Sequence, residues 1–335
     1  MNNLILIYLL ISFISLFFLT KVSYILKLVD LPNSRKIHSK PTAYTGGIIL
    51  SIILLCSIEL FSISKQDLNM ILSISFLIAI VGFIDDKYNL NIGGKLSLQI
   101  FPVLYLIIFQ NLHLNQIGDY NYFQLDLGTF AIPFTLLSIL FLINAANYFD
   151  GIDGILGTTF ISVLCILYFL VSDYSFRLFL IILVIPTSFF LFFNFSFFKL
   201  PKLFLGDGGS LLLGFILSFS LIYLEENNLV HPILLAWSVA IFVFEFLSIN
   251  IIRIKNNKRL FKAGKDHLHH LIFKSTKSIF LTNFYINLIH IILFTIGYLS
   301  FVMFNPLVSL ILFILLFIIF LILRNIYSKK NERKY

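Results

Sequence analysis

The stretch from 305 to 325 reads NPLVSLILFILLFIIFLILRN and carries no charged residue ahead of Arg324. Its apolar residues occupy every side of a helix instead of one stripe with a period of 3.6 residues, which is typical of a helix that faces lipid. About 20 residues are needed to cross the hydrocarbon core of a bilayer. The stretch therefore predicts a membrane-spanning helix.

Further apolar blocks of similar length precede this one. The predicted spans lie near 3–26, 44–63, 69–84, 96–110, 130–148, 155–171, 176–195, 209–224, 232–252, 280–302 and 305–325. The chain of 335 residues is 59% hydrophobic and 12% charged, whereas a soluble domain carries about 25% charged residues. We therefore predict an all-α, polytopic membrane protein of about 11 transmembrane helices, built as a single integral-membrane domain over residues 1–335.

The first block is predicted to remain as a span and not to be a signal peptide. Its apolar run extends from about Leu4 to Thr20; Lys21 follows that run and no basic residue precedes it, which is the reverse of a signal peptide. Cys56 and Cys165 lie inside apolar blocks and show neither metal-ligand nor disulfide spacing. On the outer side, the loop near 111–129 alternates polar and apolar residues and is predicted to form a small hairpin.

The distribution of basic residues predicts the orientation of the spans. With the N-terminus outside and the C-terminus in the cytosol, all of the 24 Lys and Arg residues except Lys65 and Arg177 fall on the inner side. This asymmetry is the positive-inside pattern of polytopic proteins. The predicted cytosolic loops are 27–43, 85–95, 148–154, 196–209 and 253–279. The net charge of +8 then follows from topology, and no nucleic acid is expected as a partner.

Four polar motifs interrupt the apolar blocks, and all four fall on the predicted cytosolic side. They are Asp85-Asp86, the stretch 144–154 (NAANYFDGIDG), the stretch 204–210 (FLGDGGS) and the stretch 267–270 (HLHH). A single aspartate at the end of a span is usually a solvated cap. Two adjacent aspartates repel each other, and a divalent cation or lysines such as Lys87 and Lys95 would relieve that repulsion.

Two further aspartates, Asp150 and Asp153, are three residues apart. On a helix they would share a face. The glycine after each of them favours a sharp turn at the membrane interface instead. In either conformation the two carboxylates can point toward one ligand.

Asp207 precedes Gly208, Gly209 and Ser210, which open a predicted span. The N–H groups at a helix N-terminus favour an anion such as phosphate, and glycines let a ligand approach the backbone closely. A carboxylate beside a phosphate needs a cation between them. Asp207 is therefore predicted to bind Mg²⁺, which prefers a few carboxylates together with substrate phosphate oxygens.

The histidines His267, His269 and His270 lie in the most basic predicted loop. Zinc is one interpretation, but no Cys or further His stands at zinc spacing. An anion-binding platform fits the basic surroundings better, and incidental histidines in a basic loop are the remaining alternative. Together, the carboxylates, the helix N-terminus and the basic loop indicate phosphoryl transfer at the inner membrane surface.

These motifs resemble, in this order, those of the polyprenyl-phosphate N-acetylhexosamine-1-phosphate transferases, the hexosamine branch of glycosyltransferase family 4. The resemblance covers most of the chain. The family's paired aspartates match Asp85 and Asp86, and its N-x-x-N-x-x-D-G-I-D-G, F-x-G-D-x-G-S and H-x-H-H patterns match the other three motifs. An inner-loop pattern matches Pro32-Asn33-x-Arg35-Lys36-x-His38-x-x-Pro41 followed by Gly46-Gly47, and Asn194 matches a nucleotide-site asparagine.

The resemblance implies a reaction in which a UDP-N-acetylhexosamine donates its sugar 1-phosphate, with GlcNAc 1-phosphate as the first choice, to undecaprenyl phosphate and releases UMP. It implies Mg²⁺, or Mn²⁺ in its place. It also implies a bacterial cytoplasmic membrane protein whose active site faces the cytosol and which begins a cell-envelope glycan such as O-antigen, teichoic acid or capsule. The expected partners are undecaprenyl phosphate, the UDP-sugar and the lipid bilayer, and a homodimer stays open.

The resemblance also implies roles for individual residues. The catalytic residues would be Asp85, Asp86, Asp207 and His267, and the metal ligands would be Asp207, Asp86 and Asp150. The nucleotide and sugar would contact Asn147, Asp150, Asp153, Asn194, His267, His269 and His270. The lipid phosphate would contact Lys36, Arg35 and Lys95.

Three alternatives stand beside this reading. A UDP-N-acetylmuramoyl-pentapeptide phosphotransferase usually shows three consecutive histidines, and Leu268 interrupts them here. A secondary transporter would place carboxylates near the bilayer midplane in broken helices, whereas these aspartate clusters lie at the ends of spans. A non-catalytic scaffold would not need the four motifs.

Two positions depart from the family pattern. Glu245 stands where the hexosamine branch often has Asp, and Gly264-Lys265 replaces an Asp-Arg pair, so the identity of the sugar stays open.

Overall fold

The computed structural model describes residues 2–32, 40–257 and 267–332. Thirteen α-helices and four short strands lie in these ranges, and the strands form two separate two-stranded sheets. The predicted all-α, polytopic membrane architecture is confirmed. The described chain divides into two compact units, one of residues 1–112 and 171–220 and one of residues 113–170 and 221–335.

Eight helices of the described chain are long and apolar enough to cross a membrane, or nine if a bent pair counts as one span. Each of the predicted ranges overlaps a helix or that pair. Two of the helices that overlap predicted spans, α2 and α6, are not among the eight, because they have 16 residues each. Roughly 20 residues are needed to cross a bilayer. The number eleven and the orientation of the termini therefore stay predictions.

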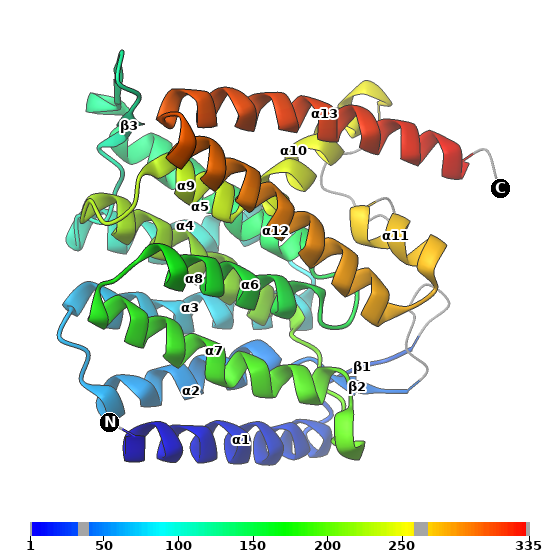
Figure 1. The fold of residues 1–335 in the computed structure, drawn as a ribbon. Helices are drawn as coiled ribbons and strands as arrows, with labels where there is room; N and C mark the ends of the chain where they lie inside the picture. The colour runs from blue at the N-terminus through cyan, green and yellow to red at the C-terminus, as the bar shows by residue number, and fades with distance from the viewer. Residues whose placement is uncertain (1, 33–39, 258–266, 333–335) are drawn as a thin grey trace. The chain divides into compact units, whose positions relative to one another are not determined.

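Six helices contribute to unit 1, and Figure 1 shows α1, α2 and α7 running side by side. They are α1 (Asn2–Ile25), α2 (Gly46–Phe61), α3 (Gln66–Tyr88), α4 (Ile92–Phe109), α7 (Tyr174–Asn194) and α8 (Gly206–Glu226), with η2 (Phe197–Lys199), β1 (Val29–Asp30) and β2 (Thr42–Ala43). The hydroxyl of Tyr8, whose side chain is fully buried, donates to the backbone oxygen of Ile182 over 3.1 Å and joins α1 to α7. Cys56 lies exposed on α2.

Unit 2 is built around the indole of Trp237, which is fully buried. Its elements are β3 (Gln116–Asp119), β4 (Gln124–Asp126), η1 (Gly128–Phe130), α5 (Ala131–Phe149), α6 (Ile155–Leu170), α9 (Pro232–Ser238), α10 (Ala240–Lys255), α11 (Leu268–Thr276), α12 (Ile279–Met303) and α13 (Pro306–Glu332). Trp237 Nε1 donates to Ser309 Oγ over 2.9 Å. A Cβ added to Gly297 would lie 2.2 Å from the indole. The indole therefore fills the space where α9, α12 and α13 meet.

The predicted span 232–252 is broken. Its two halves, α9 and α10, meet at an angle of 71°. His290 of α12 supplies a cause, because its Nε2 donates to the backbone oxygen of Ser238 over 2.8 Å while Ser162 Oγ donates to its Nδ1 over 2.7 Å. A side chain that takes a carbonyl out of the helical ladder bends a helix.

The hairpin predicted near 111–129 is confirmed, with β3 and β4 paired antiparallel. His231 anchors it to the start of α9, because its Nε2 donates to the backbone oxygen of Asp119 over 2.9 Å. Gly118 has φ +128°, and a Cβ there would lie 2.9 Å from the His231 ring. The hairpin therefore folds back onto α9.

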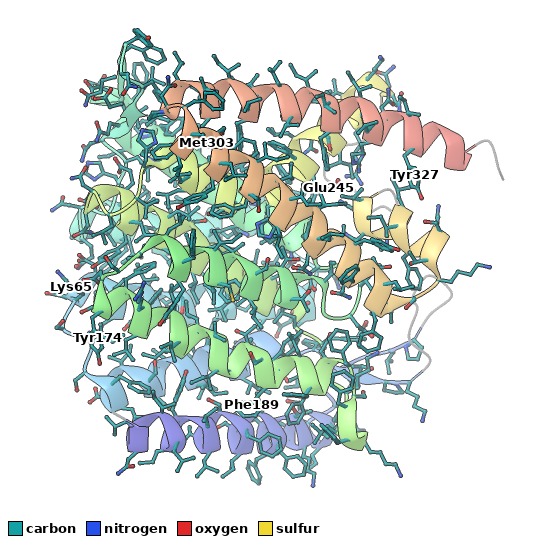
Figure 2. The ribbon with its side chains drawn as sticks, in the orientation of Figure 1. Lys65, Tyr174, Phe189, Glu245, Met303 and Tyr327 are labelled. Carbon is teal, nitrogen blue, oxygen red and sulfur yellow. The ribbon has the colours of Figure 1, made fainter. Side chains whose placement is uncertain are left out.

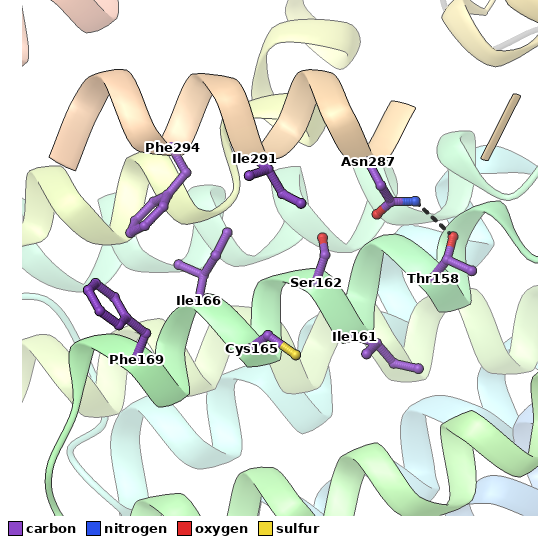
Figure 3. A pocket seen from close by; sticks show the side chains of 9 residues that line it. All are labelled: Thr158, Ile161, Ser162, Cys165, Ile166, Phe169, Asn287, Ile291 and Phe294. Carbon is purple, nitrogen blue, oxygen red and sulfur yellow. Dashed lines mark hydrogen bonds between the residues drawn. The ribbon is translucent and has the colours of Figure 1, made fainter. Parts of the chain in front are cut away.

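A pocket of about 470 Å³ lies between α6 and α12 (Figure 3). Its lining is apolar except at Thr158, Ser162 and Asn287. Asn287 Nδ2 donates to Thr158 Oγ1 over 3.1 Å. The thiol of Cys165 lies on the lining, so this side of α6 is accessible.

Candidate active site

The paired aspartates lie in the last turn of α3. The helix continues past the predicted end near 84 and stops at Tyr88, because Asn89 takes the left-handed conformation and its N–H bonds to the backbone oxygen of Asp85 over 2.8 Å. The N–H of Leu90 donates to Asp85 Oδ1 over 2.8 Å. Successive helical residues point about 100° apart. The two carboxylates are therefore directed to different partners.

Lys95 connects the Asp85-Asp86 motif with the 204–210 motif. It stands in the first turn of α4, a helix capped by Asn91, whose Oδ1 accepts the N–H of Gly94 over 2.7 Å. Lys95 Nζ lies 2.7 Å from Asp85 Oδ2 and 2.6 Å from Asp207 Oδ2. Lys95 is thus the lysine that offsets the charge of these aspartates.

The N-terminus of α8 contacts a carboxylate of the protein itself. The N–H of Gly208 donates to Asp86 Oδ2 over 3.3 Å. Gly206, the first residue of α8, has φ +71°, and a Cβ there would lie 2.7 Å from the same oxygen. The N–H groups predicted to bind phosphate are therefore partly satisfied by Asp86. The carboxylate cluster of unit 1 holds Asp85, Asp86 and Asp207 around the ammonium of Lys95, and the repulsion among three neighbouring carboxylates favours a cation.

Glycines bring the backbones of three helices together beside Asp207. A Cβ added to Gly82 of α3 would lie 2.4 Å from the backbone carbonyl of Asp207 and from the nitrogen of Gly208. A Cβ added to Gly47 of α2 would lie 2.0 Å from the nitrogen of Gly209. The first turn of α8 is therefore held backbone to backbone by α2 and α3, and this fixes the position of Asp207.

The segment that leads into α8 is held from two sides. Leu203 forms a parallel bridge with Ala43, and the backbone oxygen of Phe204 accepts the N–H of Gly46 over 3.0 Å. Asn194, buried at the end of α7, donates Nδ2 to the backbone oxygen of Leu203 over 2.9 Å. Among the described residues, the Oδ1 of Asn194 has no hydrogen-bond partner. Asn194 therefore orients this segment and keeps one acceptor available.

In unit 2, residues 150–154 form a turn between α5 and α6 and not a helical face. Gly154 has φ +77°, which only glycine adopts readily. Asn283 of α12 donates its Nδ2 to the backbone oxygen of Asp153 over 3.0 Å, and its Oδ1 accepts the hydroxyl of Thr158 over 2.9 Å. Thus α12 holds this turn in place.

The histidines begin α11. The rings of His267 and His269 are stacked with centroids 5.4 Å apart, and those of His269 and His270 are 4.3 Å apart. A Cβ on Gly151 would lie 2.2 Å from His269 Nε2, so the histidines contact the turn 150–154. His269 is fully buried, and neither ring nitrogen has a hydrogen-bond partner among the described residues. His269 is therefore enclosed between the neighbouring histidines and the turn 150–154.

Glu245 of α10 contacts the residues that begin the histidine-bearing helix α11, and Arg324 of α13 contacts Glu245. Glu245 projects from α10 (Figure 2), and its Oε1 accepts the N–H of Leu268 over 3.0 Å. His267 Nδ1 lies 3.5 Å from the same oxygen. Arg324 donates from Nε to Oε2 over 2.8 Å and from Nη2 to Oε1 over 2.9 Å. The start of α11 is thus linked to α10 and α13 through one carboxylate.

We expect the folded protein to lose stability as the pH falls below about 6.5. Burial, followed by the charges of His270 and His267, lowers the pKa of His269 well below its ordinary value. The unfolded chain then binds a proton before the folded one does. The stability that the neutral ring contributes is therefore complete above about pH 6.5 and declines below it, by up to about 1.4 kcal/mol per pH unit.

Thermal unfolding in detergent at about pH 7.5 and pH 5.5 measures this decline. A His269→Asn variant should show a smaller decline than the wild type, because the buried imidazole is absent. Equal declines in both proteins would contradict the assignment to His269.

The structure brings the predicted residues together in two groups. Asp85, Asp86, Lys95 and Asp207 form the carboxylate cluster of unit 1, and His267, His269 and His270 lie against the turn that holds Asp150 and Asp153 in unit 2. Asn147 lies in the last turn of α5. The predicted lipid-phosphate residues Arg35 and Lys36 lie outside the described residues.

Sequence reasoning missed the residues that hold these groups in place. Gly82 and Asn283 lie inside apolar helices, and Arg324 follows the most apolar run of the chain, where a basic residue usually marks the inner end of a span. The burial of Arg324 could have been suspected from the sequence, because Arg324 lies inside the predicted span 305–325.

Known proteins with similar sequences identify the family of this chain. Residues 68–225 match glycosyl transferase family 4, a range that includes all the aspartates of the two groups. The undecaprenyl-phosphate alpha-N-acetylglucosaminyl 1-phosphate transferase of Escherichia coli O157:H7 is 27% identical over 268 residues, covering 78% of this chain and 73% of that protein. The protein of that name from Salmonella typhi is 27% identical over 270 residues, with the same shares covered.

The Bacillus subtilis (strain 168) protein named probable undecaprenyl-phosphate N-acetylglucosaminyl 1-phosphate transferase is 31% identical over 255 residues, covering 72% of this chain and 68% of that protein. The chain belongs to this transferase family. The resemblance inferred from the motifs is confirmed, and with it the transferase class.

Proposed function

We propose that this transferase moves GlcNAc 1-phosphate from UDP-GlcNAc to undecaprenyl phosphate and releases UMP. The observation that carries the proposal is the carboxylate cluster of unit 1, in which Lys95 lies between Asp85 and Asp207. The names of the related transferases supply the acceptor and the sugar phosphate. The UDP-linked donor rests on the family resemblance of the motifs.

In the proposed reaction an oxygen of the lipid phosphate forms a bond to the phosphorus that carries the sugar. The bond from that phosphorus to the bridging oxygen breaks, and UMP leaves with the electron pair. A phosphate monoester with a second pKa of about 6 is largely dianionic at neutral pH. Asp85 therefore contributes more by positioning the acceptor and Lys95 than by removing a proton.

The donor set of unit 1 fits a magnesium ion. Mg²⁺ is usually held by one or two carboxylates together with substrate phosphate oxygens and water. Asp207 lies in the first turn of α8 and Asp86 accepts an N–H of that turn, so we assign these two carboxylates of unit 1 as ligands. Asp150, the other predicted ligand, lies in unit 2. When bound, Mg²⁺ or Mn²⁺ neutralises charge that develops on the departing UMP.

The remaining predicted residues receive roles on the donor. The nucleotide would contact Asn147, Asp153 and the open acceptor of Asn194. His267, His269 and His270 would contact the donor phosphates or the sugar. The excess of basic residues on one set of loops supports a cytosolic active site in a bacterial cytoplasmic membrane. The product would begin a cell-envelope glycan.

The test is UMP release by purified protein supplied with undecaprenyl phosphate, Mg²⁺ and single UDP-sugars. We expect UDP-GlcNAc to support turnover, EDTA to abolish it, and added Mg²⁺ or Mn²⁺ to restore it, because the carboxylates need a cation beside the pyrophosphate. Absence of UMP with every UDP-N-acetylhexosamine would overturn the proposal. Turnover with UDP-N-acetylmuramoyl-pentapeptide alone would assign the other branch of the family.

A further inference from the structure

Arg324 is a buried basic residue near the C-terminal end of the last helix. Its side chain is 2% exposed and that of Glu245 is 3% exposed. Two parallel N–H donors of the guanidinium bind the two carboxylate oxygens over 2.8 and 2.9 Å. A lysine in this place could not reproduce such a fork, because its ammonium is a point charge.

Stability alone does not explain this ion pair. Taking two charges out of water costs about as much as their attraction returns, and an apolar pair of similar volume is often equally stable. Burial of the pair is therefore accounted for only if the charges do something that apolar side chains cannot.

Glu245 shows what that is. The oxygen that accepts Arg324 Nη2 also accepts the N–H of Leu268, the first residue of α11. A carboxylate at this position satisfies a helix N-terminal N–H and complements the helix dipole. The same oxygen lies 3.5 Å from His267 Nδ1. One carboxylate thus sets both the start of α11 and the position of the first histidine.

The last helix also contacts the other end of α11. The hydroxyl of Tyr327, labelled in Figure 2, lies 2.9 Å from Ser275 Oγ, and α11 ends at Thr276. Arg324 and Tyr327 are three residues apart, so they lie on the same face of α13. The short helix that carries the histidines is therefore held by α13 at its beginning, through Glu245, and at its end.

We propose that Arg324 is a positioning residue for the histidines. It fixes the Glu245 carboxylate, which in turn fixes Leu268 and His267 and so aims the histidine cluster at the donor. This inference rests on the proposed function for the identity of the donor. The contacts that carry it all lie within unit 2.

The kinetic test compares Arg324→Met, Arg324→Lys and the double variant Glu245→Gln/Arg324→Met with the wild type. The double variant removes both charges while the glutamine oxygen can still accept the N–H of Leu268, so it avoids a buried unpaired carboxylate. We expect the KM for UDP-GlcNAc to rise about tenfold or more in Arg324→Met and in the double variant, with the KM for undecaprenyl phosphate unchanged. Arg324→Lys should fall between these and the wild type.

Arg177→Met is the matched control, because Arg177 lies in unit 1 and donates to the backbone oxygen of Val171. If Arg324 served folding alone, the double variant would show wild-type KM values, and that result would overturn the proposal. Amide exchange of the peptide covering residues 267–276 gives a second readout without substrate. It should quicken in Arg324→Met and not in Arg177→Met. Should the wild type release no UMP, this exchange still decides whether Arg324 holds α11, and unchanged exchange would refute it.

Discussion

Asp207→Asn should reduce UMP release by about 10³-fold or more, which corresponds to the several kcal/mol that a metal contributes to charge stabilisation. The substitution keeps the volume of the side chain but removes the charge that pairs with Lys95 at 2.6 Å and that is assigned to the metal. We expect the concentration of Mg²⁺ needed for half-maximal activity to rise as well. Steady-state rates over a Mg²⁺ titration measure both effects.

The matched control is Asp126→Asn, because Asp126 is an exposed carboxylate in β4 of the β3–β4 hairpin. It should retain wild-type rates and the wild-type dependence on Mg²⁺. Thermal unfolding of Asp207→Asn separates a lost ligand from a lost fold. A folded Asp207→Asn enzyme with near wild-type turnover would remove Asp207 from the metal site.

Gly82→Ala should destabilise unit 1 by about 1–3 kcal/mol, the usual cost of overpacking, and should abolish most activity. The added methyl would lie 2.4 Å from the backbone of Asp207 and Gly208, and backbone atoms cannot move aside as the end of a flexible side chain can. The strain is relieved by moving the first turn of α8, which displaces Asp207. Melting temperature and kcat of the purified variant measure the two consequences.

Gly93→Ala serves as the comparison within the same unit. Among the described residues, a Cβ on Gly93 would meet Asn91 Oδ1 alone, at 3.6 Å, which is an ordinary contact. Because Gly93 is helical, this change should be neutral or slightly stabilising. Equal losses in the two variants would mean that the close approach of α3 and α8 does not set the site.

The apolar blocks predicted where the helices lie, but less well where they end. The end of α3 was placed at 84, because two aspartates and a lysine look like a loop at the membrane surface. They remain helical up to Tyr88 since Asp85 is neutralised by Lys95 and bonded to Leu90. The first of these contacts comes from the next helix, and local composition does not contain it.

The break between α9 and α10 had no sequence signal. Neither proline nor glycine stands at the break, which falls at Val239, and the polar residues Glu245, Ser248 and Asn250 all lie further along the segment. The cause is His290, which lies far along the chain and takes the carbonyl of Ser238. Only the packing of α12 against this segment reveals that a histidine in a predicted span bends a different helix.

For the site, motif spacing predicted which residues carry charge but not how they are paired. Asp86 was assigned to the metal and the α8 N-terminus to phosphate, whereas Asp86 Oδ2 itself accepts the N–H of Gly208. The histidines were predicted to lie in a basic loop; they begin α11, and His269 is fully buried against Gly151. Burial depends on contacts between segments more than 100 residues apart in the sequence, and a single sequence does not give those contacts.

The two cysteines of the chain are natural attachment sites for a pair of spin labels. Both are unpaired and exposed, with Cys56 on α2 in unit 1 and Cys165 at the pocket of α6 in unit 2. Because the sequence contains no third thiol, nitroxide labelling of the unaltered protein places one electron spin in each unit. A dipolar distance distribution recorded with and without UDP-sugar would then report directly whether donor binding draws the two units together.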